Sequence, residues 1–284
     1  MSKLPPVGAL WIGGSLTWLE QLCLKSFVAH GHETTLFTYN EVKGVPDGVI
    51  IRDGREIVDT GDFVKHARTE SVALFSDLFR FHMIQKTPGI IYVDTDVYCL
   101  RPLDIDEPNL FGYESMERDR GRLNGAVLRL APESPLLSEM LSFMEDEYPE
   151  PTWLSPAWKR QMAERRAGGD PVHVSEMPWG IWGPLGITNL ARSTGEAKHA
   201  KPPEFFYPVH FKERISLFKR PMKVERFLTE NSYTIHMWAP IKRYAGKRYD
   251  GLCPPRSYIG HQLALHGIDP AKAPTTHWRV VSYD

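Results

Sequence analysis

The stretch Pro88-Gly89-Ile90-Ile91-Tyr92-Val93-Asp94-Thr95-Asp96 decides how we interpret this chain. Its Pro-Gly pair predicts a turn, and the four apolar residues that follow predict a strand covered on both faces. Two carboxylates come directly after that strand. Carboxylate oxygens are the ligands that hard divalent cations prefer, so Asp94 and Asp96 form a candidate site for Mn²⁺ or Mg²⁺.

The Asp-x-Asp spacing alone is weak support for a metal site, because Asp104-Ile105-Asp106 repeats it further along the chain. Context separates the two pairs, since Asp94 follows an apolar strand whereas Asp104 follows a turn that contains a proline. Taken in isolation, Asp94 and Asp96 are equally well explained as solvated loop residues. The segments around them favour a site.

The preceding segment, Ser71 to Lys86, has helical length and apolar residues on nearly every face, which predicts a buried helix. Asp77 and Arg80 are neighbours on one face of that helix because they stand at positions i and i+3. A structural ion pair is one interpretation. We favour a ligand site, because buried ion pairs stabilise proteins weakly relative to apolar residues and costly polar groups cluster at functional sites.

The rest of the chain alternates strand and helix patterns. The sequence predicts strands at 7–12, 34–39, 110–113, 124–130, 205–211 and 232–238, a short hairpin near 49–54, helices at 16–29, 135–148 and 156–166, and a basic, irregular tail from 242 onward. Strand-helix-strand order is that of a parallel crossover unit, which binds ligands at the carboxyl ends of its strands. We therefore expect an α/β fold with a central mixed sheet flanked by helices.

The segment 131–200 is expected to form a helical insertion over this sheet. Four tryptophans lie in it and could either line a glycan groove or pack the insertion on the sheet: Trp153, Trp158, Trp179 and Trp182. For Trp153 and Trp158 we favour packing.

Composition limits the class of protein. The 284 residues are 42% hydrophobic and 24% charged, which is ordinary for a globular protein, and we expect one domain over 1–284. The formal net charge of -1 provides no overall field to attract nucleic acid. Nucleic acid is therefore not an expected partner, whereas a peripheral membrane contact stays open.

Cysteine usage and the absence of apolar runs indicate a compartment. Cys23, Cys99 and Cys253 are odd in number and widely spaced, so neither a disulfide framework nor a thiolate metal site is predicted. The first residues form no signal peptide, and no stretch approaches the roughly 18 apolar residues of a membrane-spanning helix. We expect a cytoplasmic protein.

Several of these segments together resemble glycosyltransferase family 32, the DXD sugar-binding family. The resemblance is carried by Ser76-Asp77-Leu78-Phe79-Arg80, the Pro88 to Asp96 stretch and Arg101-Pro102-Leu103. The family includes yeast initiating mannosyltransferases, α-1,4-galactosyltransferases and bacterial capsular-polysaccharide transferases. The core is also similar to that of the clostridial glucosylating toxins, whose WIGG segment matches Trp11-Ile12-Gly13-Gly14. Pro88 stands where the family usually has glycine, which alters only the turn.

The resemblance implies a GT-A type fold and a role for each matching residue. It implies that Trp11 stacks on the nucleotide base and that Asp77 and Arg80 bind the donor sugar and take part in catalysis. Asp94 is implied to contact ribose and sugar hydroxyls, while Asp96 is a direct metal ligand with Asp94 beside it. The chemistry agrees, because an aromatic plane can stack on a base, and a carboxylate beside a guanidinium can pair with sugar hydroxyls.

Two later segments extend the resemblance to the catalytic and acceptor sides. Asn124 lies in the segment Leu123 to Val127, which resembles a strand that reaches the transferred sugar in related retaining enzymes. A turn-forming Asn-Gly pair is an equally good interpretation. The segment Gly183 to Thr188 resembles a motif near the family's acceptor side.

A third segment, His236-Met237-Trp238, resembles the family's C-terminal His-x-Trp motif, and Lys242 follows it. Neutral imidazole is an acceptable ligand for Mn²⁺, so we predict a metal site of Asp94, Asp96 and His236. Trp238 and Lys242 are predicted to bind the nucleotide-sugar cofactor, with Lys242 near the leaving diphosphate. A lone histidine after a strand is more often a core residue, and its position after the recognised core favours the metal.

The predicted activity is that of a metal-dependent hexosyltransferase, which moves a hexosyl unit from a nucleoside diphosphate sugar to a hydroxyl of a glycan or glycolipid. We expect UDP rather than GDP as the nucleotide, a nucleotide-sugar half at about 1–130 and an acceptor half at about 131–284. The family implies retention of anomeric configuration, and a front-side reaction is expected because no covalent nucleophile stands out. The alternatives are a metal-dependent phosphodiesterase or nucleotidyltransferase, and a catalytically silent sugar-nucleotide-binding protein.

Overall fold

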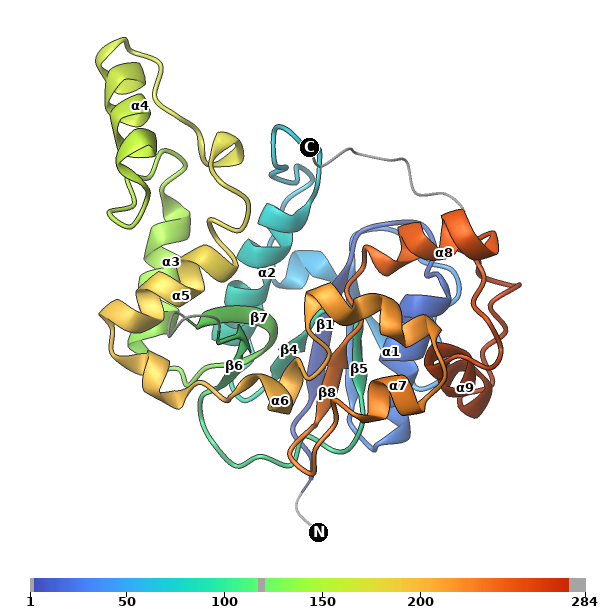
Figure 1. Ribbon diagram of the computed structural model, residues 1–284. Coiled ribbons are helices and arrows are strands. Elements are labelled where there is room, and N and C mark those ends of the chain that lie inside the picture. Colours follow the sequence, from blue (N-terminus) through green and yellow to red (C-terminus); the bar gives the residue numbers. More distant parts are fainter. Residues whose placement is uncertain (1–2, 117–120, 276–284) are drawn as a thin grey trace.

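The computed structural model describes residues 3–116 and 121–275. A central sheet is flanked by helices (Figure 1). The strands are β1 (Val7–Trp11), β2 (Thr34–Thr38), β3 (Val49–Asp53), β4 (Ile91–Val93), β5 (Val97–Cys99), β6 (Leu110–Ser115), β7 (Arg122–Arg129) and β8 (Thr234–His236). The α-helices are α1 (Trp18–Ala29), α2 (Ala73–Lys86), α3 (Pro135–Glu145), α4 (Pro156–Ala167), α5 (Pro184–Ser193), α6 (Pro203–Phe206), α7 (Met222–Glu225), α8 (Ile241–Tyr249) and α9 (Tyr258–Leu265).

Six strands form one mixed sheet in the order β3-β2-β1-β4-β7-β6, and β5 pairs separately with β8. β1 is parallel to β2 and β4, whereas β7 is antiparallel to β4 and β6. The predicted α/β fold with a central mixed sheet and flanking helices is confirmed. Because β7 runs opposite to β4, Asn124 near the start of β7 comes close to Asp94 at the end of β4.

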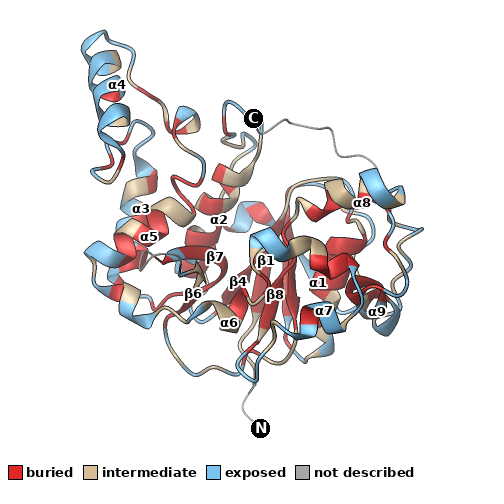
Figure 2. Ribbon diagram, in the orientation of Figure 1, coloured by how far each residue is buried: buried red, intermediate tan, exposed pale blue. Residues whose placement is uncertain are grey.

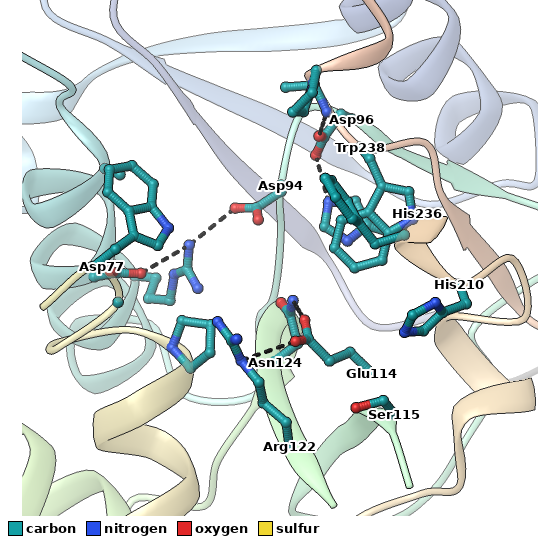
Figure 3. A pocket seen from close by; sticks show the side chains of 18 of the residues that line it. Asp77, Asp94, Asp96, Glu114, Ser115, Arg122, Asn124, His210, His236 and Trp238 are labelled. Carbon is teal, nitrogen blue, oxygen red and sulfur yellow. Dashed lines mark hydrogen bonds and ion pairs between the residues drawn. The ribbon is translucent and has the colours of Figure 1, made fainter. Parts of the chain in front are cut away.

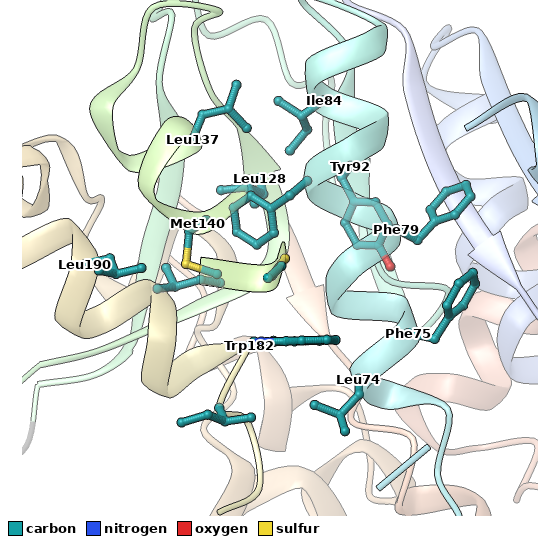
Figure 4. Packing of buried hydrophobic residues seen from close by; sticks show 14 of the residues in the cluster. Leu74, Phe75, Phe79, Ile84, Tyr92, Leu128, Leu137, Met140, Trp182 and Leu190 are labelled. Carbon is teal, nitrogen blue, oxygen red and sulfur yellow. The ribbon is translucent and has the colours of Figure 1, made fainter. Parts of the chain in front are cut away.

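Successive side chains of a strand point to opposite faces of the sheet, so the hydrophobic core is divided between the two faces. In β4, Tyr92 joins the cluster that packs against α2, α3 and α5, while Val93 joins the cluster that packs against α1. Figure 4 shows the first of these clusters, in which Phe79 of α2 lies close to Tyr92 and Met140 of α3 approaches Leu128 of β7. Burial is concentrated in the strands and in the inward faces of the helices (Figure 2). The end of β4 that precedes the acidic residues is therefore held by packed layers on both faces of the sheet.

The buried helix predicted at 71–86 is present as α2, with Asp77 and Arg80 both buried. The insertion predicted at 131–200 is only partly over the sheet. Within it, α5 packs on β7 and α3 packs on α2 and α5, whereas α4 projects away from the body of the molecule (Figure 1). Only Met162 of α4 is buried.

Three of the local predictions are wrong. The hairpin expected near 49–54 is a single strand, β3, which pairs in parallel with β2 and so belongs to a second crossover connection. The strand expected at 205–211 is instead α6 followed by the 3₁₀-helix Phe211–Phe218. Its aromatic residues favour a strand, but Pro203 occupies the first turn of a helix, where proline is well accommodated.

The tail expected to be irregular from 242 onward contains α8 and α9. The many basic residues of α8 make its apolar positions hard to recognise in the sequence. Ile241 and Ala245 of this helix are buried in a cluster shared with α1 and α9. Cys23, Cys99 and Cys253 are buried free thiols. Within 3–116 and 121–275, no helix combines the length and the apolar character needed to cross a membrane.

Candidate active site

A cavity of about 1330 Å³ opens beside the end of β4 and the start of β7 (Figure 3). It brings together most of the site residues predicted from the sequence: Asp77, Arg80, Asp94, Asp96, Asn124, His236 and Trp238. They come from α2, from the turn between β4 and β5, from β7 and from the segment that begins with β8. Residues distant in the sequence thus share one cavity because the strand order places their elements next to each other.

Arg80 lies between two carboxylates in the cavity wall. Its Nη2 is 3.3 Å from Asp77 Oδ1 and 3.1 Å from Asp94 Oδ1. The Tyr92 hydroxyl donates a 3.0 Å hydrogen bond to the same Asp94 oxygen, and the guanidinium lies 4.7 Å from the centre of the Tyr92 ring. These contacts fix the end of β4 against α2.

Two glycines bring the backbone close to this ion-pair network. A Cβ atom at Gly125 would lie 2.3 Å from Arg80 Nη1, and one at Gly183 would lie 2.6 Å from Asp77 Oδ2. Neither distance is possible for a real side chain without displacing the charged groups. The network is therefore enclosed on two sides by backbone, from β7 and from the turn before α5.

Burial and pairing compete in setting the charges of this network. Burial raises the pKa of Asp77 to about 6, against the opposing attraction of Arg80. Burial alone would lower the pKa of Arg80, but the carboxylates of Asp94 and Asp77 outweigh it, and the net pKa lies above its ordinary value. A ligand hydroxyl that reaches this wall finds a permanent cationic donor and carboxylate acceptors side by side.

Asp96 is held by the β5–β8 pair. His236 lies opposite Val97 in this pair and brings its Nε2 atom to 3.1 Å from Asp96 Oδ1. The backbone N–H of Ala239 donates to Asp96 Oδ2 at 2.5 Å. Burial tends to raise the pKa of Asp96, but His236 and the Ala239 N–H outweigh it, so the net pKa is lowered.

Asp94, Asp96 and His236 each offer one ligand atom, and these atoms all lie within 4.8 Å of one another. Two carboxylates and one imidazole are a donor set that suits Mn²⁺ and is compatible with Mg²⁺. The imidazole atom that faces Asp96 is Nε2, so this atom of His236 is on the side where the two carboxylates lie. The residues therefore fit a divalent cation.

Trp238 forms the wall of the cavity beside His236. The two rings are stacked with centroids 3.9 Å apart, and the indole N–H donates to the Val209 carbonyl at 3.0 Å. Trp238 has a φ of 62°, in the left-handed region that non-glycine residues rarely adopt. Such backbone strain persists where the surroundings fix it and clusters at functional sites.

Glu114 adds a carboxylate that the sequence did not single out. Its Oε2 accepts a 2.5 Å hydrogen bond from Asn124 Nδ2, and its Oε1 lies 2.9 Å from Arg122 Nε. Asn124 Oδ1 accepts from the Ala126 N–H at 2.8 Å, and the Tyr207 hydroxyl donates to the Asn124 carbonyl at 3.2 Å. Asn124 is thus fixed at the amide and at the backbone, which a mobile Asn-Gly turn would not be.

Trp11 and Lys242 are not among the residues that line the cavity. The Lys242 ammonium forms a buried ion pair with Glu20 and lies 5.4 Å from the centre of the Trp11 ring. Trp11 ends β1, which neighbours β4 in the sheet. Their roles toward the nucleotide stay predictions, with Lys242 beside Trp11 and outside the cavity lining.

Several cavity residues had no distinctive pattern in the sequence: His66, Glu114, Arg122 and His210. Glu114 could have been noticed because it follows a strand pattern at 110–113, as Asp94 follows its own strand. The others come from loops or from a strand start, and only the fold brings them to the cavity. Asp104, the apparent twin of Asp94, is exposed and does not line the cavity.

Neither a family model nor a curated protein sequence matches this chain. Among solved structures, it is similar to the PaToxG glycosyltransferase, with a TM-score of 0.40, 13% identity and coverage of 68% of this chain and 69% of that one. It is also similar to mouse xyloside xylosyltransferase 1 in its apo form, with a TM-score of 0.41, 12% identity and coverage of 82% of this chain and 96% of that one. These likenesses concern the fold alone.

Proposed function

We propose that this chain is a metal-dependent glycosyltransferase of the GT-A type, which transfers a hexosyl unit from a UDP-sugar to an acceptor hydroxyl with retention of configuration. The observation that carries the proposal is the convergence of Asp94, Asp96 and His236 within 4.8 Å at a cavity that also contains the Asp77–Arg80 pair. A cation site beside a pair suited to sugar hydroxyls matches the diphosphate and the adjoining sugar of a nucleoside diphosphate sugar.

A divalent cation held there would neutralise the charge that develops on the departing diphosphate. Arg80 and Asp77 would hold the hydroxyls of the donor sugar, because the guanidinium donates and the carboxylates accept. Trp11 would stack on the base, and Trp238 would close the cavity beside the cation site. These groups orient the donor and add electrostatic stabilisation near the breaking bond.

In the front-side reaction, the bond from the anomeric carbon to the diphosphate oxygen breaks as the bond to the acceptor oxygen forms on the same face. The departing phosphate oxygen takes the proton of the acceptor hydroxyl, so no protein base is needed. The amide of Asn124 would face the transferred sugar with one N–H still available, since the other is engaged by Glu114. The halves at about 1–130 and 131–284 would serve the donor and the acceptor.

The direct test is incubation with a panel of UDP- and GDP-sugars, with Mn²⁺ or with a chelator, followed by analysis of every product. We expect release of nucleoside diphosphate together with hexose or glycoside, and loss of that release in chelator. A phosphodiesterase or nucleotidyltransferase would instead release nucleoside monophosphate or sugar phosphate. A panel in which no sugar nucleotide binds or turns over would refute the proposed function.

Glu114 supplies a sharper test of how Asn124 is positioned. We expect Glu114→Leu to lower turnover about tenfold or more, because a hydrogen bond to a charged group is worth roughly 1.5–3 kcal/mol and Asn124 loses that partner. Glu114→Gln keeps an acceptor oxygen for Asn124 and should restore much of the rate. The measurement is kcat for sugar-nucleotide hydrolysis in the two variants, with thermal unfolding as a check on folding. Equal rates in the leucine variant and the unmodified chain would remove Glu114 from this role.

A further inference from the structure

Trp179 is a large aromatic residue that lines the cavity while staying 39% exposed. The other tryptophans of the 131–200 segment differ from it. Trp182 is buried in the α2-side cluster, and Trp153 and Trp158 pack against the same cluster. The segment thus has its own packing residues, and burial of apolar surface does not account for the position of Trp179.

The indole of Trp179 is held in position by its neighbours. The His66 ring lies against it with centroids 5.4 Å apart, and His66 itself is buried with Nε2 3.2 Å from the Met177 carbonyl. The loops that carry the two rings are joined by a backbone hydrogen bond of 2.8 Å from Ala67 to Ser175. A ring fixed in this way loses little conformational entropy when a ligand lies on it.

The strand order shows which end of the cavity Trp179 borders. β1, β4 and β7 are consecutive in the sheet, so Trp11 ends the first of them, Asp96 follows the second, and Asn124 lies near the start of the third. The loop that carries Trp179 adjoins the Asp77–Arg80 pair, because a Cβ at Gly183 would lie 2.6 Å from Asp77 Oδ2. Trp179 therefore borders the end where the donor sugar would lie, away from the base at Trp11.

The cavity is large enough for more than one small ligand. Its volume of about 1330 Å³ exceeds the range of roughly 300–1,000 Å³ that is usual for a single small-molecule ligand. The face of an aromatic ring carries partial negative charge, which suits the C–H bonds that line one face of a pyranose ring. An exposed indole beside the Asp77–Arg80 pair is thus suited to a sugar ring and not to a charged phosphate.

We propose that Trp179 is the platform of an acceptor subsite, on which a pyranose ring of a glycan acceptor lies with its C–H face against the indole. This inference rests on the proposed function and names its acceptor as a carbohydrate. Asp77 and Arg80 then border both the donor sugar and the ring on Trp179, while His66 keeps the indole in place.

The test compares the unmodified chain with Trp179→Ala, Trp179→Phe and, as a matched control, Tyr148→Ala. Tyr148 is 41% exposed and is not among the residues that line the cavity. Each protein is given the UDP-sugar panel with Mn²⁺ and with methyl or p-nitrophenyl hexopyranosides as acceptor probes. Two quantities are measured: the KM for the pyranoside, and the Kd for UDP by calorimetry.

We expect at least one pyranoside to accept the sugar. For that pyranoside, KM should rise about five- to tenfold in Trp179→Ala, the effect of losing a contact worth roughly 1 kcal/mol. Trp179→Phe should recover part of the affinity and Tyr148→Ala should match the unmodified chain. The Kd for UDP should change less than about twofold in all three variants, since the base and diphosphate lie at the other end.

Either of two results overturns the acceptor subsite while leaving the transferase intact. One is hydrolysis of a UDP-sugar with no response to any pyranoside. The other is a pyranoside KM that is the same in Trp179→Ala as in the unmodified chain. Failure of every sugar nucleotide to turn over is a different outcome, because it removes the proposed function on which the subsite rests.

Discussion

Asp96→Asn is expected to lower metal-dependent turnover of the sugar nucleotide by at least about a hundredfold, because a cation that stabilises the departing diphosphate is worth several kcal/mol. The substitution replaces a charged oxygen ligand by a neutral amide of the same shape. Weaker binding of the cation should also be detectable without turnover, as loss of Mn²⁺ binding measured by calorimetry or by electron paramagnetic resonance.

Folding should largely survive this substitution. The amide oxygen of the introduced asparagine can still accept from the Ala239 N–H, as Asp96 does at 2.5 Å, so one of the two side-chain contacts is preserved. The contact with His236 then joins the imidazole to an amide instead of a carboxylate. This weaker contact lowers the free energy of unfolding by about 1 kcal/mol. Asp104→Asn is the matched control, since it makes the same chemical change in the exposed twin motif and should leave activity unaltered. An Asp96→Asn protein that binds Mn²⁺ and turns over normally would remove Asp96 from the metal.

The sequence predicted the central part of the fold because its signals there are local. Four apolar residues before Asp94 specify a buried strand, and the apolar helix before them carries two charges one turn apart, as observed in β4 and α2. The periphery was predicted less well. β3 pairs in parallel with β2, which is a choice of neighbour that a five-residue run does not encode. At Phe205 and Phe206, a proline at the start of the segment outweighs the strand preference of the aromatic residues.

The site shows the same division between local and non-local information. Asp77, Arg80 and Asp94 could be grouped from spacing and resemblance, and all three meet in one ion-pair network. Glu114 could not be grouped with Asn124, because β6 and β7 bring them together through antiparallel pairing. Trp179 could not be separated from Trp182, since exposure depends on how the whole segment packs.

Lys242→Met is expected to reduce the free energy of unfolding by about 3–5 kcal/mol, the usual cost of removing one partner from a buried ion pair. The Lys242 ammonium and the Glu20 carboxylate are both almost fully buried, with side chains 3% and 2% exposed. The pair joins α8 to the start of α1, where Glu20 also accepts from the backbone N–H of Thr17 at 2.8 Å. Chemical denaturation of the variant measures the loss, which comes chiefly from the carboxylate left buried without its counter-charge.

The double variant Glu20→Gln/Lys242→Met decides whether that reasoning is correct. It leaves no uncompensated charge, and the amide oxygen of the introduced glutamine can still accept from the Thr17 N–H, so it should unfold at a higher denaturant concentration than Lys242→Met alone. If the double variant were as unstable as the single one, the loss would come from packing around the lysine stem instead. The folded double variant also tests the role toward the diphosphate predicted from the sequence. A chain that binds UDP normally without Lys242 would confine this residue to holding α8 against α1.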